Sequence, residues 1–132
     1  MMESRFRAAL IAWLAADPAL VGALNDVTEE APSRAAPPWL GIAASASTDW
    51  STKTARGREI RVALELQTRG EEADETAAIA ALVEARIESV PPAQDGFAIA
   101  STTFLRARAE QRLRNTRAVL LEYRFRVLEA IT

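Results

Sequence analysis

Two stretches of the chain alternate between apolar and polar residues. In residues 58–67 the apolar positions are Ile60, Val62, Leu64 and Leu66. In residues 119–127 they are Val119, Leu121, Tyr123, Phe125 and Val127. Successive side chains of a strand point to opposite faces, so a period of two indicates a strand with one buried and one solvated face. We therefore expect half-buried strands at both positions.

Two shorter apolar runs are also typical of strands. Residues 39–45 follow Pro37-Pro38, and residues 97–105 follow Asp95-Gly96, a pair that favours a turn. Each run predicts a strand. The proline-rich segment 25–38 shows neither the strand period nor the helix period, and we interpret it as an ordered surface connection.

Apolar residues recur at intervals of three and four in two other stretches, which is the spacing of an amphipathic helix. The first helix is expected to end near Ala16, with the apolar face Phe6, Leu10, Trp13 and Leu14. Asp17-Pro18 then favours a short second turn. The other helix begins with acidic residues, ends at Pro91-Pro92, and carries the stripe Ile79, Leu82, Val83, Ile87 and Val90.

These elements follow the order helix, strand, strand, helix, strand, strand. The order predicts an α+β fold in which a four-stranded antiparallel or mixed sheet carries two main helices on one face. At 132 residues the chain is close to the commonest domain size, so residues 1–132 are expected to form a single domain. Hydrophobic residues at 49% and charged residues at 26% are ordinary values for a folded protein.

Composition removes several kinds of chemistry. The sequence has no cysteine and no histidine, which excludes disulfides, thiol catalysis, histidine-based triads and an ordinary zinc site. The five glycines stand apart and form no phosphate-binding motif. A dense acidic group coincides with a helix start, where the helix dipole favours carboxylates, and consists of Glu71, Glu72, Asp74 and Glu75. We predict no active site and no cofactor.

No membrane segment is expected. The apolar run 8–16 is far shorter than the roughly 20 residues that a spanning helix needs. The same run belongs to the amphipathic first helix, which argues against a signal peptide. A soluble intracellular protein is the better interpretation.

Charge is distributed unevenly although the formal net charge is only −2. Residues 70–95 hold seven acids and one base, whereas residues 100–132 hold seven arginines and three glutamates. Surfaces of opposite sign suit head-to-tail contact between identical subunits. Pairing of the acidic and basic elements within one chain is the equally open alternative.

A basic run lies in the second half of the chain and comprises Arg106, Arg108, Arg112, Arg114 and Arg117. Such a run can contact nucleic-acid phosphates. However, Glu110 interrupts it, and it holds no aromatic residue that could stack on bases. We therefore favour a solvated hairpin loop that pairs with an acidic neighbour.

The segment 47–59, with the sequence STDWSTKTARGRE, separates two predicted strands. It combines Trp50 with three basic residues, Lys53, Arg56 and Arg58. A tryptophan in a polar loop is a candidate interface anchor, and local packing under the loop is as good an explanation. We interpret the segment as an arm beyond the sheet edge, with Gly57 as the turn that lets the next strand begin.

This arm also carries a family resemblance. Asp49-Trp50-Ser51-Thr52-Lys53, followed by Gly57 and Glu59 at the start of an amphipathic strand, resembles the tail-completion or tail-terminator family of long-tailed phages and phage-derived gene transfer agents. The resemblance extends over nearly the whole chain, through Asp17-Pro18 with Leu20-Val21-Gly22-Ala23-Leu24, Pro37-Pro38-Trp39-Leu40, the acidic helix start after Thr68, and Tyr123-Arg124-Phe125-Arg126-Val127.

The resemblance implies a non-enzymatic structural protein without cofactors. Family members form a ring, typically of six subunits, on the head-proximal end of the completed tail tube. The ring ends tube polymerisation and offers a docking surface to the head–tail connector, and DNA later passes through its lumen. The expected partners are therefore other copies of the chain, the tail tube protein and the connector or stopper protein. The expected location is the tail–head junction of a particle made in the bacterial cytoplasm.

Three groups of residues are the expected protein interfaces: the arm residues Asp49, Trp50, Lys53, Arg56 and Arg58, the acidic-helix residues Glu84 and Glu88, and the basic-region residues Arg106, Arg108, Arg112 and Arg114. In a ring, the acidic helix 71–88 would meet the basic region 106–126 of a neighbouring subunit, or would face the lumen and repel DNA. The main alternative is a small cytoplasmic nucleic-acid-binding or regulatory module that uses the arginine-rich segment 106–117. An enzyme accessory subunit is a second alternative.

Overall fold

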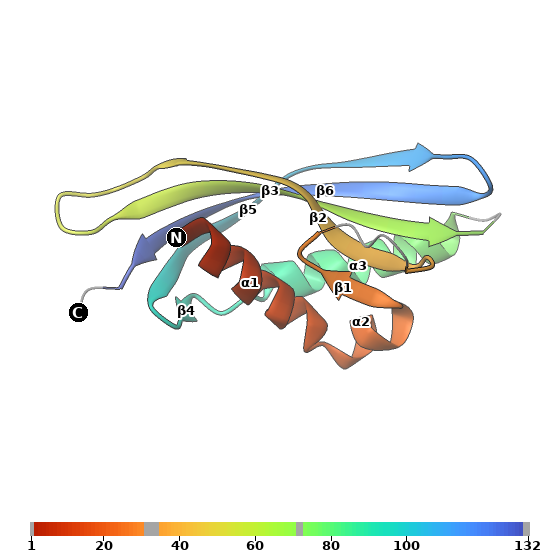
Figure 1. Cartoon of the computed structure of the whole chain (residues 1–132), viewed down its shortest axis with the longest axis horizontal. Helices are drawn as coiled ribbons and strands as arrows, with labels where there is room; N and C mark the ends of the chain where they lie inside the picture. The colour runs from red at the N-terminus through yellow and green to blue at the C-terminus, as the bar shows by residue number, and fades with distance from the viewer. Residues whose placement is uncertain (1, 31–34, 71–72, 131–132) are drawn as a thin grey trace.

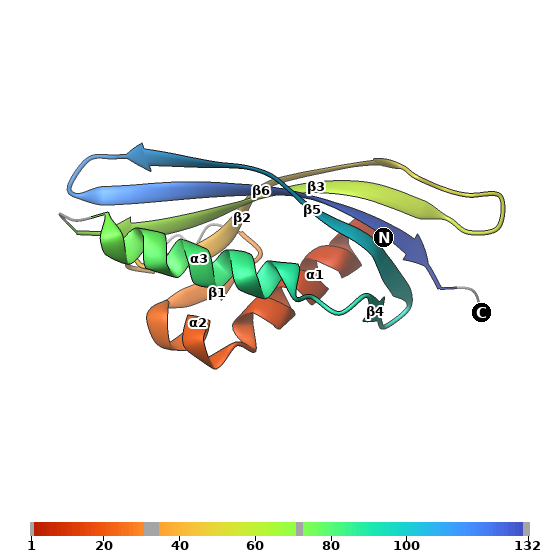
Figure 2. The same cartoon turned by 180° about the vertical axis from the view of Figure 1, so that it is seen from behind.

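The computed structural model describes residues 2–30, 35–70 and 73–130. Figure 1 shows a long twisted sheet with the helices gathered against one of its faces, and Figure 2 shows the same arrangement from behind. The α+β class predicted from the sequence is confirmed. In chain order the elements are α1 (Met2–Ala15), α2 (Pro18–Ala23), β1 (Asp26–Thr28), β2 (Trp39–Asp49), β3 (Gly57–Arg69), α3 (Asp74–Glu88), β4 (Ala93–Gln94), β5 (Phe97–Gln111) and β6 (Thr116–Glu129).

Within these residues the sheet has six strands, in the order β1-β2-β3-β6-β5-β4. Its centre is the antiparallel pair β3 and β6, in which Ile60 lies opposite Phe125. β2 and β5 extend it antiparallel on either side, and β1 runs parallel to β2, so the sheet is mixed. The prediction of four strands is therefore wrong by two. The additional strands have three and two residues, too few for a period to appear in the sequence.

The basic region is mainly strand and not the hairpin loop expected from the sequence. β5 runs to Gln111 and β6 begins at Thr116. Between them, Arg114 and Asn115 have φ values of 60° and 57°, the left-handed conformation that a tight two-residue hairpin turn requires. Antiparallel pairing holds the arginines of β5 in extended conformation, with Arg106 opposite Glu122.

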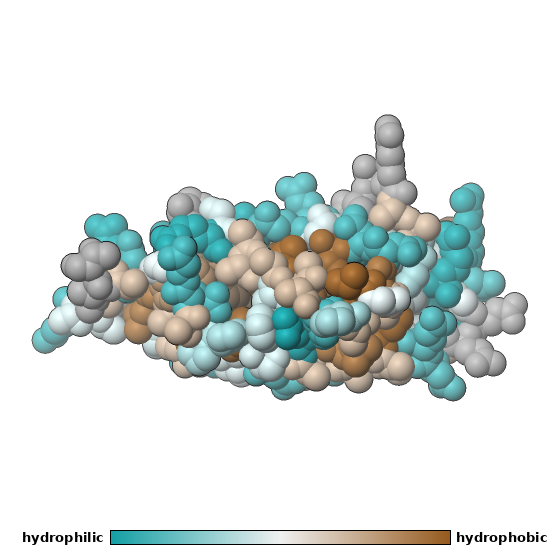
Figure 3. Space-filling view, turned by 90° about the horizontal axis from the view of Figure 1, so that it is seen from below, coloured by the Kyte–Doolittle hydropathy of each residue, from teal (hydrophilic) through white to brown (hydrophobic). Residues whose placement is uncertain are grey.

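The core lies between the sheet and the helices. Phe6 of α1 is 1% exposed, and its ring centroid lies 4.6 Å from that of Phe125 and 6.4 Å from that of Phe97. The inward residues of β3 and β6 that alternate in the sequence are buried in this same cluster. Figure 3 shows the helix-covered side, where patches of hydrophobic residues lie among hydrophilic ones.

A reciprocal contact joins α1 to α3. The Trp13 indole N–H donates to the Arg86 carbonyl at 2.7 Å, and Arg86 Nε donates to the Trp13 carbonyl at 2.9 Å. The Arg86 guanidinium lies 3.3 Å from the centroid of the Trp13 ring, a cation–π arrangement. These contacts fix the position of α3 against the first helix.

The described residues form three helices, where two main ones were expected. The short turn predicted after Asp17 is the helix α2, and the Asp17 carboxylate accepts a hydrogen bond from the Ala19 N–H at 3.1 Å. Glu71 and Glu72 of the expected acidic helix start lie outside the described residues. A buried hydrogen bond of 2.6 Å between Thr68 and Thr76 ties β3 to α3.

Candidate assembly surfaces

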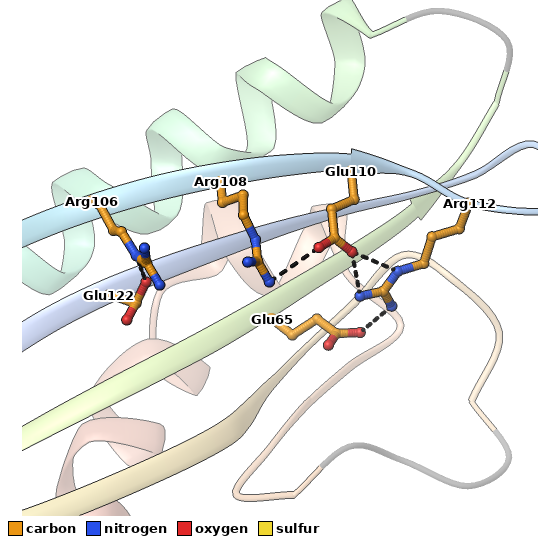
Figure 4. A network of polar contacts seen from close by, with 6 residues as sticks. All are labelled: Glu65, Arg106, Arg108, Glu110, Arg112 and Glu122. Carbon is orange, nitrogen blue, oxygen red and sulfur yellow. Dashed lines mark hydrogen bonds and ion pairs between the residues drawn. The ribbon is translucent and has the colours of Figure 1, made fainter.

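The sheet face that no described helix covers carries rows of opposite charges. Because β3, β5 and β6 alternate, their polar residues point away from the core. Arg106 of β5 pairs with Glu122 of β6, the residue opposite it in the register. Arg108 lies 3.1 Å from Glu110 on the same strand. Figure 4 shows these residues pointing toward one another across the strands.

The charge rows continue through Arg112 toward the centre of the sheet. Arg112 lies 3.0 Å from Glu110 and 3.1 Å from Glu65 of β3, so one guanidinium joins two carboxylates from different strands (Figure 4). The hydrogen bond with Glu110 and the charge of Glu65 raise the pKa of Arg112 above its usual value, against a smaller opposing effect of burial. We call the set Glu65, Arg106, Arg108, Glu110, Arg112 and Glu122 the charge ladder.

A second group lies nearer the other end of the sheet. Glu59 of β3 lies 3.2 Å from Arg126 and 3.9 Å from Arg124, both on β6. Among the described residues, the ion pairs of Arg106, Arg108, Arg112, Arg124 and Arg126 are therefore made with glutamates of their own sheet. Arg114, the remaining member of the expected basic interface, is exposed in the β5–β6 turn.

The expected arm is a β-hairpin with a short loop. β2 continues to Asp49 and β3 begins at Gly57, so only residues 50–56 lie outside the strands. The Trp50 N–H donates to the Gly57 carbonyl at 3.0 Å, and the Gly57 N–H donates to the Ser51 hydroxyl at 3.0 Å. A Cβ on Gly57 would collide with the Trp50 carbonyl. Close backbone approach, and not a turn, explains this glycine.

Trp50 is half-buried, and its ring centroid lies 5.5 Å from the guanidinium carbon of Arg126. Local packing on β6 thus explains part of its burial. Lys53 lies at the tip of the same hairpin and is exposed.

Three arginines meet in an open depression of about 470 Å³ beside this hairpin. Arg5 of α1, Arg56 of the loop and Arg58 of β3 line it, together with Met2, Asp49, Ser51, Gly57 and Glu129. Arg5 donates to the Asp95 carbonyl at 3.0 Å, and Arg58 donates to the Ser47 hydroxyl at 3.4 Å. None of the three forms an ion pair with a described carboxylate. We call this site the arginine depression.

Sequence reasoning identified Asp49, Arg56 and Arg58 but missed Arg5. The first helix brings Arg5 to the hairpin from more than forty positions away, and no local pattern marks it. Gly96, with φ at 84°, accommodates the contact, because a Cβ there would collide with the Arg5 guanidinium.

Glu84 and Glu88 lie on α3, away from the charge ladder. Glu84 is half-buried and Glu88 is exposed. Burial raises the pKa of Tyr123 well above its usual value, and the negative charges of Glu88 and Glu84 raise it further. The ring of Phe104, 44% exposed, lies 5.5 Å from the Tyr123 ring. Glu84, Glu88 and Phe104 form what we call the acidic patch.

The described residues contain no group of three or more acidic side chains placed to hold a metal ion. Within the same residues, no helix has both the length and the apolar character required to span a bilayer. What the surface does contain is charge arranged in extended groups, which suits protein–protein contact.

Comparison with known proteins agrees with an assembly role. Residues 8–128 match the family model described as "Tail completion protein gp17". One similar solved structure is a chain of the "Virion of native gene transfer agent (GTA) particle", with 25% sequence identity, coverage of 92% of this chain and 93% of that chain, and a TM-score of 0.77. Comparison with curated proteins gave no match.

Proposed function

The chain belongs to the tail completion protein gp17 family, and we propose that it forms a ring that caps the head-proximal end of a tail tube. Its general role is that of a structural protein of a phage-type tail. The finer statement is that the ring, of six subunits, ends polymerisation of the tube and joins the tail to the head connector. DNA would pass through the lumen of the ring.

One observation carries the proposal. The family match spans 8–128, and the likeness to a chain of a gene transfer agent virion covers 92% of this chain, so both extend across the fold together with its hairpins and charged surfaces. A likeness confined to the core would support the fold alone. The proposed location is the tail–head junction of a particle assembled in the bacterial cytoplasm, and the proposed role is structural rather than enzymatic.

We assign the β2–β3 hairpin to contacts within this assembly. Its tip holds the exposed Lys53, and its base holds the partly buried Trp50. A partly exposed aromatic ring beside cations is a common interface anchor. The neighbouring subunit and the tail tube protein are its proposed partners.

The alternative of nucleic-acid recognition through 106–117 is weakened by the charge ladder. Arg106, Arg108 and Arg112 each lie within ion-pair distance of a glutamate, and phosphate binding would have to displace those partners. No observation in the described residues favours this function over the structural one.

The test is to delete the gene in a particle-producing strain and restore it on a plasmid. If the proposal is right, the deletion yields unjoined heads and tails with tubes of irregular length, because nothing stops tube growth. Restoration returns joined particles, and cryo-electron microscopy locates the chain at the junction. Joined particles of normal tail length in the deletion strain would overturn the proposal.

A further inference from the structure

The arginines of the two sites differ in whether a carboxylate lies within ion-pair distance. On the charge ladder, every arginine has a carboxylate within about 3 Å. In the arginine depression, Arg5, Arg56 and Arg58 have no described carboxylate within ion-pair distance, although Asp49 and Glu129 line the same space. Three arginines and two carboxylates line the depression, which leaves an excess of positive charge that an added anion would neutralise.

The carboxylates divide in the same way. Glu59, Glu65, Glu110 and Glu122 are neutralised on the sheet. Within the described chain, Glu84 and Glu88 of α3 form no ion pair. They are four residues apart on one helix, so their side chains lie on the same face, where two like charges destabilise each other.

Geometry favours a contact between copies. The arginine depression lies at the β2–β3 hairpin, at one end of the long axis, whereas α3 runs along the other half of the sheet (Figures 1 and 2). The two unneutralised groups are thus on different surfaces of one subunit. Two different complementary surfaces are what a closed head-to-tail ring requires.

The surface around Glu84 and Glu88 also admits close approach. The α3 positions Ala77, Ala81 and Ala85 are exposed and lie on the same side of the helix as Glu84 and Glu88, so small side chains flank the two carboxylates. Phe104 adds an exposed aromatic ring packed against Tyr123, and guanidinium groups bind carboxylates and stack on aromatic rings alike.

We propose that the arginine depression of one copy receives Glu84 and Glu88 of the next copy, with a guanidinium packed on Phe104. The contact repeats around the ring, so this inference rests on the proposed function and names its subunit interface. It replaces the basic region 106–126 as the partner of the acidic helix, because the ladder arginines are already neutralised within the chain.

The first test uses the scarcity of lysine. Lys53 is the only lysine of the chain, so Arg56→Lys adds one amine to the depression without changing its charge. Purified particles carrying this variant are treated with a carbodiimide, which joins amines directly to carboxylates. The expected product is a dimer cross-linked between position 56 and Glu84 or Glu88, lost when Glu84→Gln and Glu88→Gln are added. A cross-link from position 56 to a different protein, or none to α3, overturns the proposal.

The second test reverses charge. Arg56→Glu with Arg58→Glu, or Glu84→Lys with Glu88→Lys, is expected to lower subunit association at least about tenfold, as measured by sedimentation and by recovery of joined particles. Mixing the two variants restores assembly at a ratio of one to one, because each supplies the surface that the other lacks. The matched control, Arg106→Glu with Arg108→Glu, makes the same charge change on the ladder and leaves assembly within about twofold.

These outcomes separate the two proposals. If the chain is absent from the tail–head junction, the proposed function fails. If the chain is at the junction but hairpin reversal is harmless, or ladder reversal is the harmful change, only the interface proposal fails. Normal rings that deliver DNA poorly after Glu84→Lys and Glu88→Lys would instead place α3 at the lumen, and would also overturn it.

Discussion

The charge ladder and the arginine depression both contain several arginines, but in the described chain those of the ladder are paired with carboxylates and those of the depression are not. Arg106 lies opposite Glu122 of the neighbouring strand, Arg108 pairs with Glu110 of its own strand, and Arg112, just past the end of β5, reaches Glu110 and Glu65. The sheet neutralises these arginines as it forms. Arg5 and Arg58 are brought together only by the packing of α1 against the hairpin, and no described acid pairs with them. A run of arginines in the sequence is thus a poor indicator of a binding surface, and the pairing observed in the fold is a better one.

The difference has an energetic side. Exposed ion pairs of the ladder type contribute about 0–1 kcal/mol each, so the ladder contributes little to the stability of the fold. An unpaired group of like charges costs free energy in the isolated subunit and recovers it on binding a counter-charge. The charges of the ladder are therefore neutralised within the sheet, whereas the positive charges of the depression remain able to bind the negative charges of a partner.

The largest effect is expected from a substitution that moves the β2–β3 hairpin, and with it Arg56 and Arg58, without changing any charge. Gly57→Val places a side chain against the Trp50 carbonyl and the Val127 carbonyl, both of which are backbone atoms that cannot rotate away. We expect a loss of about 3 kcal/mol in unfolding free energy, measured by urea denaturation, together with loss of subunit association. The ladder ion pairs should survive.

Gly22→Ala is the control for that change. Gly22 lies in α2 with nothing within 4 Å of an added Cβ, and alanine is the better helix former. The expected result is a gain of about 0.5–1 kcal/mol with normal assembly. Equal stability of the Gly57 and Gly22 variants would mean that the hairpin is not held by the close approach described above.

Trp50→Ala addresses the hairpin anchor. The substitution removes the ring that lies over Arg126, which should lower the unfolding free energy by about 1 kcal/mol. If Trp50 also contacts a neighbouring subunit or the tube, ring formation and tail completion fall much further than this small change predicts. Intact tail completion by the variant would assign Trp50 to local packing alone. Trp50→Phe, which keeps an aromatic ring, is the matched control.

The sequence predicted the parts of the fold in which one face is buried. β3 and β6 were placed correctly because Ile60 and Phe125 belong to strictly alternating series. The distal half of β5 was missed because its inward positions are Ala107 and Ala109, small residues that read as neutral between arginines. Short edge strands such as β1 escape for a different reason, since their pairing is set by a partner strand and not by their own residues.

The same distinction applies to the candidate sites: residues that share one segment could be found from the sequence, and residues brought together by folding could not. Arg56 and Arg58 could be singled out from the sequence because an aromatic residue and several cations share one segment. Arg5 could not, since its site forms only when α1 packs across the end of the sheet. The basic run was expected to form a hairpin loop that pairs with an acidic neighbour. Its glutamate partners could not be identified from the sequence, because the register that places Glu122 opposite Arg106 and Glu65 within reach of Arg112 exists only between strands.

A smaller effect is expected from weakening one connection of the ladder. Glu65→Gln removes the carboxylate that joins Arg112 to β3 and should lower the unfolding free energy by about 0.5 kcal/mol. The difference from the unaltered protein should shrink in 1 M salt, where exposed charges are screened. Assembly should be unchanged. A loss of assembly in Glu65→Gln would show that the ladder is itself an interface.

The smallest expected effect is a change in DNA binding. Because ladder glutamates occupy the arginines, the unaltered protein is expected to give no gel shift with duplex DNA at about 150 mM salt. Glu110→Gln with Glu122→Gln leaves Arg106 and Arg108 without their partners, and weak, salt-sensitive binding should appear. Glu84→Gln with Glu88→Gln makes the same charge change on α3 and serves as the control. Tight binding by the unaltered protein would mean that phosphates displace the ladder glutamates easily. The arginines of the ladder would then be as free to bind an anion as those of the arginine depression.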